Sequence, residues 1–404
     1  MPELEGNNGR EKNRDHRFRL AFIVSHPIQY YAPLYQRLAR RDDIAVKIFF
    51  TWHAGARAVH DHGFGVPIAW DIPLVHGYDF ELAKNISSDP GTHHFWGLRN
   101  PDLVPRVLDW RPDAVHITGW AWASHLRALK AFHDRKLPTL FRGDSHLLHE
   151  KMSGPRWWLK KNALKQVYRW PTRFLVTGAA NRAYYETFGV ESRKLVYCPH
   201  SIDVARFAEP AAVYEEEARR WRVELGIPPD KTVLLFAGKF EPLKRPLEFM
   251  KIVASLPRDD LMAVLVGDGE LQAEMKALAE RNPGRFKLLP FQNQSRMPVV
   301  YRLGDVYVLP SVRETWGLAV NEALACGRPV LVSDGAGCAR DLVDEQCGEI
   351  FSWDRGDLRD KICQMTKAKP RLEEMRISAS AKAWQFDLAE TETALLHSLN
   401  QPAS

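Results

Sequence analysis

The feature that most constrains the fold is a regular alternation between short apolar runs and longer segments with helical spacing. The runs that predict strands are 18–24, 44–50, 113–118, 138–142, 173–177, 194–198, 232–238, 261–267, 286–289, 305–310 and 329–333. Segments with helical spacing lie between them, for example 120–135, 243–255, 270–281 and 317–326. Most of the runs are apolar throughout, which is typical of parallel strands covered by helices on both faces. The pattern therefore predicts an α/β chain with doubly wound sheets.

The length of 404 residues favours two large domains or three small ones. A polar, acidic helical segment, AVYEEEARRWRVELG, interrupts the alternation and places the boundary near residue 206. We predict a disordered tail over 1–17, a first domain over 18–205, a second over 206–375, and a C-terminal helix and tail over 376–404. The helical pattern of 371–397 is not followed by a strand, so this segment is free to pack anywhere, including back across the first domain.

Charge and composition exclude several classes of protein. The net charge is only +6, from 56 Lys and Arg against 50 Asp and Glu, and no nucleic-acid-binding motif accompanies it. The five cysteines include no C-x-x-C pair, which argues against a zinc site or a disulfide framework. No apolar run approaches the ~20 residues that span a bilayer, and the polar start lacks the apolar core of a secretory signal. We expect a cytoplasmic protein with no nucleic-acid partner.

The segment LPSVRETWGLAVNEALACGRPVLVSD, residues 309–334, carries the clearest chemical signal. A predicted strand ends in a loop with Glu314, a helix starts at Gly317 and Leu318, and Glu322 lies inside that helix. Free N–H groups at a helix start form an anion site suited to a diphosphate. Glu322 lies five residues beyond Gly317, about 8 Å along the helix, so the two carboxylates can bind hydroxyls on opposite sides of a diphosphate. The alternative is that Glu314 caps the helix and Glu322 is solvated.

This segment resembles the E-x7-E signature of family 4-type retaining glycosyltransferases, the glycosyl transferases group 1, which have the GT-B fold. The resemblance includes the tail from Glu322 to Val330, E-A-L-A-C-G-R-P-V. It implies two Rossmann-like domains facing a cleft, a nucleoside-diphosphate sugar as the donor, and neither a cofactor nor a metal. It also implies that Glu314 binds sugar hydroxyls, that Glu322 binds the ribose, and that no protein nucleophile is needed.

Three further segments of the second half resemble the same family. FAGKFEPLKRP places Gly238, Lys239 and Lys244 as in the family's G-R-x-x-x-x-K loop, with Lys239 where Arg is commoner. Two cations there would neutralise a leaving diphosphate without a metal. VLVGDGELQAEM places Gly267 in a tight turn on the nucleotide side, and Phe291 follows the next strand where the family contacts the base. Surface lysines and a structural turn are the plainer interpretations of these residues.

The first half departs from the family pattern at two places. His26, Gln29 and Tyr30 replace a glycine-rich loop after the first strand, which suggests side-chain contacts to the acceptor or a phosphate. Asp144 falls where many relatives have a catalytic-face histidine, and His146 follows two residues later. Either residue can face the reacting sugar, and an Asp-Ser turn that caps the next helix is the alternative. Trp120, at the end of another predicted strand, is a candidate for lining the acceptor pocket.

Residues 151–185 contain eight basic residues and no acid. On a helix, Lys161, Lys165 and Arg169 lie one turn apart, with Trp158 on the same side. Tryptophan beside cations suits anionic lipid head groups, and a solvated basic face is the alternative.

We predict a transferase that moves a sugar to a hydroxyl acceptor with retention of configuration, the acceptor being a glycan or a lipid-linked intermediate of cell-surface polysaccharide synthesis. The basic stretch predicts a peripheral contact with an anionic membrane, at its inner face. A nucleotide-sugar epimerase, a glucan synthase and a non-catalytic sugar- or membrane-binding protein remain alternatives on this fold. The base, the sugar, the acceptor, the linkage and the oligomeric state are left open.

Overall fold

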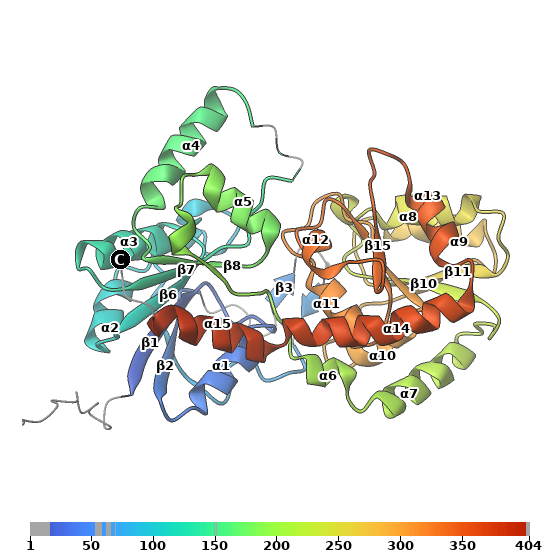
Figure 1. Ribbon diagram of the computed structural model, residues 1–404, viewed down its shortest axis with the longest axis horizontal. Coiled ribbons are helices and arrows are strands. Elements are labelled where there is room, and N and C mark those ends of the chain that lie inside the picture. The colour runs from blue at the N-terminus through green and yellow to red at the C-terminus, as the bar shows by residue number, and fades with distance from the viewer. Residues whose placement is uncertain are drawn as a thin grey trace, which may run out of the picture.

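Each half of the chain builds its own sheet of parallel strands, as Figure 1 shows for a computed structural model that describes residues 17–52, 59–61, 66–68, 70–148, 150 and 152–400. The first sheet has seven strands in the order β5-β2-β1-β6-β7-β8-β9. These are β1 (Phe18–Val24), β2 (Ile44–Phe50), β5 (Asp79–Leu82), β6 (Ala114–Thr118), β7 (Thr139–Arg142), β8 (Arg173–Val176) and β9 (Leu195–Tyr197).

Helices cover both faces of the first sheet. They are α1 (Ala32–Ala39), α2 (Leu103–Asp109), α3 (Ala123–Asp134), α4 (Pro155–Val167) and α5 (Ala179–Thr187), with short 3-10 turns η1 (Phe95–Gly97) and η2 (Ser192–Lys194). Alternate residues of β1 enter two separate apolar cores, Ala21 and Ile23 on one face and Leu20 and Phe22 on the other. Burial on both faces explains why the strand reads as a continuous apolar run.

The second sheet repeats this plan with six strands in the order β12-β11-β10-β13-β14-β15. The strands are β10 (Thr232–Ala237), β11 (Leu261–Val266), β12 (Phe286–Leu289), β13 (Val306–Leu309), β14 (Val330–Ser333) and β15 (Gly348–Phe351). The helices are α6 (Val204–Ala208), α7 (Ala211–Glu224), η3 (Pro242–Lys244), α8 (Pro246–Ser255), α9 (Gln272–Glu280), α10 (Met297–Arg302), α11 (Leu318–Ala325), α12 (Ala339–Leu342) and α13 (Leu358–Met365).

The strand order reverses once in each sheet, at β1 in the first and at β10 in the second. Ligands of doubly wound sheets bind beyond the carboxyl ends of the strands at such a switch point. In the second domain the loops after β10 and β13 flank that point, and they carry Lys239, Lys244 and Glu314. The topology thus brings together two segments that lie about 70 residues apart in the sequence.

The C-terminal segment crosses from the second domain to the first. α14 (Lys369–Ala383) packs on α11, the turn η4 (Trp384–Phe386) follows, and α15 (Leu388–Asn400) lies along α1 (Figure 1). Glu392 of α15 forms ion pairs with Arg37 and Arg41 of the first domain. Of the packings left open for this segment, the structure shows the return across the first domain. The helical pattern over 371–397 corresponds to α14 and α15, with η4 between them, and the domain limit at 376 stays a prediction.

All eleven predicted strands are present, most of them one residue shorter at an end. The sequence patterns missed β5 and β15 as well as the antiparallel pair β3 (Val59–Asp61) and β4 (Val66–Ile68). β5, with the sequence DFEL, lies at the sheet edge with mostly exposed side chains, and β15, with the sequence GEIF, lies at the other sheet's edge. Such strands lack the long apolar run on which the prediction depended. Most of the tail predicted over 1–17, and residues 401–404, lie outside the described residues.

The change from one domain core to the other falls close to β9. Cys198 belongs to a core of the first domain, whereas Ile202 and Val204 belong to a core of the second. The boundary near 206 stays a prediction, with the two cores meeting a few residues before it. Within the described part of the chain, no helix is both long enough and apolar enough to cross a bilayer.

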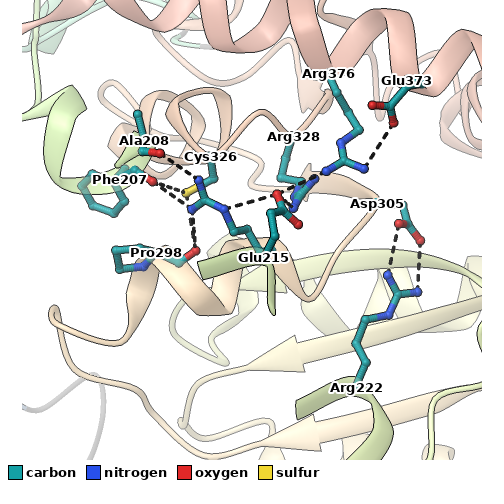
Figure 2. Close-up of polar contacts among 11 residues, drawn as sticks. Phe207, Ala208, Glu215, Arg222, Pro298, Asp305, Cys326, Arg328, Glu373 and Arg376 are labelled. Carbon is teal, nitrogen blue, oxygen red and sulfur yellow. Dashed lines mark hydrogen bonds and ion pairs between the residues drawn. The ribbon is translucent and has the colours of Figure 1, made fainter. Parts of the chain in front are cut away.

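A buried charge cluster holds α7 against the rest of the second domain. Arg302 of α10, Arg328 before β14 and Arg376 of α14 all form ion pairs with Glu215 of α7. Figure 2 shows Arg328 and Arg376 turned towards Glu215, with Arg222 and Asp305 forming a separate pair nearby. The side chains of Arg302 and Arg328 are each only 2% exposed, so the single carboxylate serves two buried cations.

Candidate functional site

A cleft of about 1110 Å³ opens between the two domains, beyond the carboxyl ends of both sheets. Most of its walls come from loops that follow a strand, as expected for facing doubly wound sheets. The first domain contributes Gln29, Tyr30, Trp70, Asp144 and His200, and the second contributes Gly238, Gly267, Phe291, Tyr301, Glu314, Trp316, Gly317, Leu318 and Glu322, among others. The cleft therefore collects most of the donor-side residues predicted from the sequence.

The start of α11 has the backbone geometry of an anion site. Gly317 has φ +105°, and a Cβ there would lie 2.9 Å from Leu309 Cδ2, so this position needs glycine. Within α11 and its flanks, no side chain forms a capping hydrogen bond at this end of the helix. The first N–H groups of α11 are thus left to a ligand in the cleft, and Glu314 is not the helix cap that the plainer interpretation supposed.

The Glu314 side chain is held beside the helix start by two contacts within the second domain. Its carboxylate pairs with Lys244 and accepts a hydrogen bond of 3.4 Å from Ser311 Oγ. Lys239 and Lys244 line a second hollow of about 780 Å³ that also borders Gly238, Glu314 and Gly317. The two predicted cations therefore lie next to the predicted anion site, on the side away from the first domain's cleft residues.

Glu322 lies one turn further along α11 and is not solvated. Its Oε2 accepts a hydrogen bond of 2.6 Å from Tyr301 Oη. Burial raises the pKa of the Glu322 carboxyl, while the Tyr301 hydrogen bond and the charge of Arg206 oppose that shift. A carboxylate with one oxygen fixed by a tyrosine presents the other to a ligand hydroxyl.

On the side of the cleft predicted to bind the nucleotide, two backbone segments approach each other closely. Gly267 has φ +151°, and a Cβ there would lie 1.9 Å from the carbonyl oxygen of Gly238. Only glycine fits where these two strand ends meet. Phe291 lines the cleft next to them, and its ring lies 6.5 Å from that of Trp70 in the first domain.

Asp144 and His146 have different positions. Asp144 lines the cleft, whereas His146 is buried and its Nε2 donates a hydrogen bond of 2.8 Å to the backbone oxygen of Glu314. His146 Nδ1 accepts from the Leu148 N–H, which places the ring proton on Nε2. His146 thus braces the Glu314 loop from the opposite domain, and of the two residues Asp144 is the one that lines the cleft.

Asp144 is charged although it is half-buried. Burial raises the pKa of its carboxyl, but the neighbouring His200 and Arg142 outweigh that effect and lower the pKa to about 2. His200 Nε2 lies 3.5 Å from Asp144 Oδ2, and Arg142 Nε lies 4.0 Å from Oδ1. The cleft therefore contains a fixed negative charge opposite the predicted diphosphate site.

The other predicted first-domain residues divide between the cleft and the core. Gln29 and Tyr30 line the cleft. His26 is not among the cleft-lining residues: its Nδ1 lies 2.9 Å from Ser25 Oγ, and burial lowers its pKa to about 4. Trp120 donates to Tyr168 Oη at 3.2 Å and packs on the domain core, so it does not line the cleft either.

Sequence reasoning missed His200, Trp70, Tyr301 and Trp316, which all line the cleft. His200 follows the last strand of the first sheet by three residues, so examining the residues after every strand would have found it. Tyr301 belongs to a helix and Trp70 to a long loop, and neither has a local pattern that marks it. The predicted membrane residues Trp158, Lys161, Lys165 and Arg169 lie outside the cleft, on or just after α4.

Comparisons with known proteins agree with this geometry. The family model described as glycosyl transferases group 1 matches residues 217–382, which run from α7 into α14 and contain Lys244, Glu314 and Glu322. The second domain is a glycosyl transferases group 1 domain.

Two named relatives each match about half of this chain. A D-inositol 3-phosphate glycosyltransferase of Nocardia farcinica is 30% identical over 241 residues, 55% of this chain and 51% of that protein. A D-inositol 3-phosphate glycosyltransferase of Mycolicibacterium smegmatis is 30% identical over 192 residues, 45% and 43% of the two chains. The chain spans about half the length of the curated relatives it matches.

Structural likeness extends over nearly the whole chain. Anabaena HepE, solved in complex with UDP and glucose, matches with a TM-score of 0.69 and 18% identity, over 95% of this chain and 99% of that one. WaaG, a glycosyltransferase involved in lipopolysaccharide biosynthesis, matches with a TM-score of 0.65 and 17% identity, over 93% and 99%. The group 1 domain and its partner domain thus form the GT-B fold, two Rossmann-like domains facing a cleft.

Proposed function

We propose that this protein is a retaining glycosyltransferase that moves a sugar from a nucleoside-diphosphate sugar to a hydroxyl acceptor. The observation that carries the proposal is the grouping of an uncapped helix start at Gly317 and two fixed carboxylates, Glu314 and Glu322, in the interdomain cleft, with the cation of Lys244 in the adjoining hollow. This grouping suits a diphosphate between two hydroxyl-bearing rings.

Each group has a distinct role in the proposed transfer. The N–H groups of α11, Lys239 and Lys244 bind the diphosphate and stabilise its departure. Glu314 binds hydroxyls of the transferred sugar, and Glu322 with Tyr301 binds the ribose. The acceptor oxygen bonds to the anomeric carbon on the face that the diphosphate leaves, while the bond from that carbon to the phosphate oxygen breaks. The departing phosphate takes the acceptor's proton, so the step balances without a protein nucleophile.

The names of the relatives and solved structures suggest which classes of donor and acceptor this protein uses. HepE is solved with UDP and with UDP-glucose, and the curated relatives are named for transfer to D-inositol 3-phosphate. WaaG is described as involved in lipopolysaccharide biosynthesis. We propose a nucleotide sugar as the donor, and as the acceptor a glycan or lipid-linked intermediate of cell-surface polysaccharide synthesis, used in the cytoplasm.

A thermal-shift screen with UDP, GDP and ADP, followed by release of free diphosphate from a panel of nucleotide sugars, tests the proposal. A ligand that binds only the native state raises the melting temperature, and the Glu322→Ala variant is expected to reduce that rise. Transfer of the sugar to an added acceptor supports a transferase. Conversion of the nucleotide sugar without diphosphate release would instead indicate an epimerase. Growth of a polymer from an ADP-sugar would indicate a glucan synthase, and binding without turnover would indicate a non-catalytic protein.

Activity is expected to persist in excess chelator, because Lys239, Lys244 and the α11 N-terminus carry the leaving-group charge. Among the described residues, one group with ligand atoms within 4.8 Å of one another has metal-ligand character, Asp89, His93 and His94, and it does not line the cleft. Initial rates with and without EDTA check this expectation. A rate that collapses in EDTA and returns with manganese or magnesium would contradict the metal-free mechanism.

We also propose that the enzyme contacts an anionic membrane through α4. Trp158 and Leu159 are 64% and 61% exposed, and the exposed Lys160 and Lys165 flank them on the same helix. Figure 1 shows α4 at the outer edge of the first domain, remote from α14 and α7. Exposed apolar side chains beside cations favour an interface between water and acidic lipid. Lys151, the first residue of the predicted basic stretch, lies outside the described residues.

Binding to vesicles that contain acidic phospholipid is expected to exceed binding to neutral vesicles and to fall with salt. Raising the salt from 0.1 M to 1 M shortens the screening length from about 10 Å to about 3 Å, which removes the electrostatic part of the attraction. Co-sedimentation at the two salt concentrations measures it. Trp158→Ser should weaken binding at both, because insertion of the indole is apolar, whereas equal and negligible binding to both lipids would leave α4 as a solvated face.

A further inference from the structure

His200, which no motif marks, contacts both halves of the candidate site. Its ring stacks on Tyr31 at 6.0 Å with an interplanar angle of 10°, and the Trp316 ring lies 6.0 Å away in the second domain. Its backbone oxygen accepts a hydrogen bond of 3.1 Å from Asn321 Nδ2 of α11, the helix that begins at the anion site. The imidazole is therefore fixed in place from both domains.

The ring lies behind the carboxylate of Asp144. The His200 side chain is 4% exposed and that of Asp144 is 24% exposed, with 3.5 Å between Nε2 and Oδ2. Burial lowers the pKa of His200, so the ring is neutral near pH 7 and has one proton. In the described structure His200 Nδ1 is buried without a hydrogen-bond partner. A proton on Nδ1 would be left unsatisfied, so the proton belongs on Nε2, where it meets the carboxylate.

We propose that His200 is a positioning residue, which turns the Asp144 carboxylate into the cleft and keeps it ionised there to accept a hydrogen bond from a substrate hydroxyl. The inference rests on the proposed function and deepens it. It assigns the first-domain side of the site to a neutral, hydroxyl-bearing group, because an anionic group at that place would be repelled by Asp144.

The surroundings of Asp144 explain why the carboxylate needs this partner. A buried carboxylate is costly unless donors or cations face it. The titratable and charged groups that surround it on the neighbouring elements are Tyr30, Tyr31, His116, Arg142, Tyr185, Cys198 and His200. Of these, Arg142 is the cation, and its guanidinium also donates to the backbone oxygens of Cys198 and Pro199. Arg142 supplies charge from one side and His200 a donor from the other, so losing His200 leaves Oδ2 without its donor.

A double-mutant cycle between His200→Phe and Asp144→Asn tests the proposal, with initial rates of sugar transfer measured across pH 5–9. His200→Phe keeps a ring between Tyr31 and Trp316 but removes the donor. We expect kcat to fall on the order of 10²-fold through misplacement of Asp144, with a smaller change in KM for the donor. His200→Gln, which retains an N–H donor, should recover part of the rate.

In the Asp144→Asn background, His200→Phe should lower kcat no further. His125→Phe is the matched control: His125 is also fully buried, but its ring bonds Thr51 and backbone oxygens rather than a carboxylate. It should leave the pH profile unchanged. Additive losses in the double variant, or a His200→Gln variant no more active than His200→Phe, would overturn the role of His200.

The same pair can be monitored without turnover. The measurement is the melting temperature of the wild type, the two single variants and the double variant between pH 4 and pH 7. A carboxyl whose folded-state pKa is lowered adds stability above its unfolded pKa and loses it as the pH falls through the folded pKa, here about 2. Without His200 that pKa rises and the contribution shrinks, so at pH 7 His200→Phe should lower the melting temperature more in the Asp144 background than in the Asp144→Asn background. An inactive wild type would contradict the proposed function alone, whereas equal losses at pH 7 in the two backgrounds would contradict the His200–Asp144 pair.

Discussion

Lys244→Ala is expected to lower kcat for sugar transfer by about 10²- to 10³-fold, which corresponds to about 2.7–4 kcal/mol of lost transition-state stabilisation. Lys244 pairs with Glu314 next to the α11 N-terminus, in the hollow that adjoins the cleft. Negative charge builds up on the departing diphosphate, so a preorganised cation there acts mainly in the transition state. Steady-state rates with saturating donor, compared with the thermal shift produced by the free nucleoside diphosphate, separate this effect from weaker binding.

Lys251→Ala is the matched control, since Lys251 is an exposed lysine on α8 outside the cleft. It should leave kcat within twofold of the wild type. Lys244→Arg should restore part of the rate, because it returns a cation with a different donor geometry. If Lys244→Ala retains wild-type turnover, the assignment of the leaving-group site to this hollow is wrong.

The fold was predictable because doubly wound sheets bury both faces of their strands. β10, for example, places Val233 and Leu235 in one core and Leu234 and Phe236 in another, so no polar residue interrupts the pattern. Edge strands such as β5 have one open side and mixed side chains, and they were missed for that reason. The division of the C-terminal segment at η4 was missed because it depends on the position of the first domain, which no local pattern encodes.

The two halves of the candidate site also differed in how well the sequence predicted them. The donor residues Lys244, Glu314 and Glu322 come from short motifs tied to strand ends and one helix start, so their spacing predicts their grouping. The acceptor side is assembled from loops that follow different strands, and its partner His200 is joined to Asp144 only by the tertiary fold. Trp120 was expected in the pocket because it follows a strand, but its indole turns to Tyr168 and the core.

Glu215→Ala is expected to destabilise the second domain by about 2 kcal/mol, which is below the cost of breaking a fully buried ion pair because the Glu215 side chain is 41% exposed. The variant leaves Arg302 and Arg328 as buried cations without a carboxylate (Figure 2). Burial already disfavours the charged form of Arg328: it lowers the pKa of the guanidinium to about 10, while Glu215 opposes that shift. For a domain of this size the loss corresponds to a fall in melting temperature of roughly 4–8 °C.

Glu216→Ala is the matched control for that measurement, because Glu216 is the next residue of α7 and pairs with Arg219 and Arg220 at the surface. Exposed pairs of this kind contribute about 0.3–0.5 kcal/mol, so its melting temperature should stay within about 2 °C of the wild type. Glu215→Gln keeps the side-chain volume and removes only the charge, so it should retain most of the loss seen with alanine. A Glu215→Ala variant as stable as Glu216→Ala would show that water or backbone oxygens already satisfy the two arginines, and that α7 is held by its apolar contacts alone.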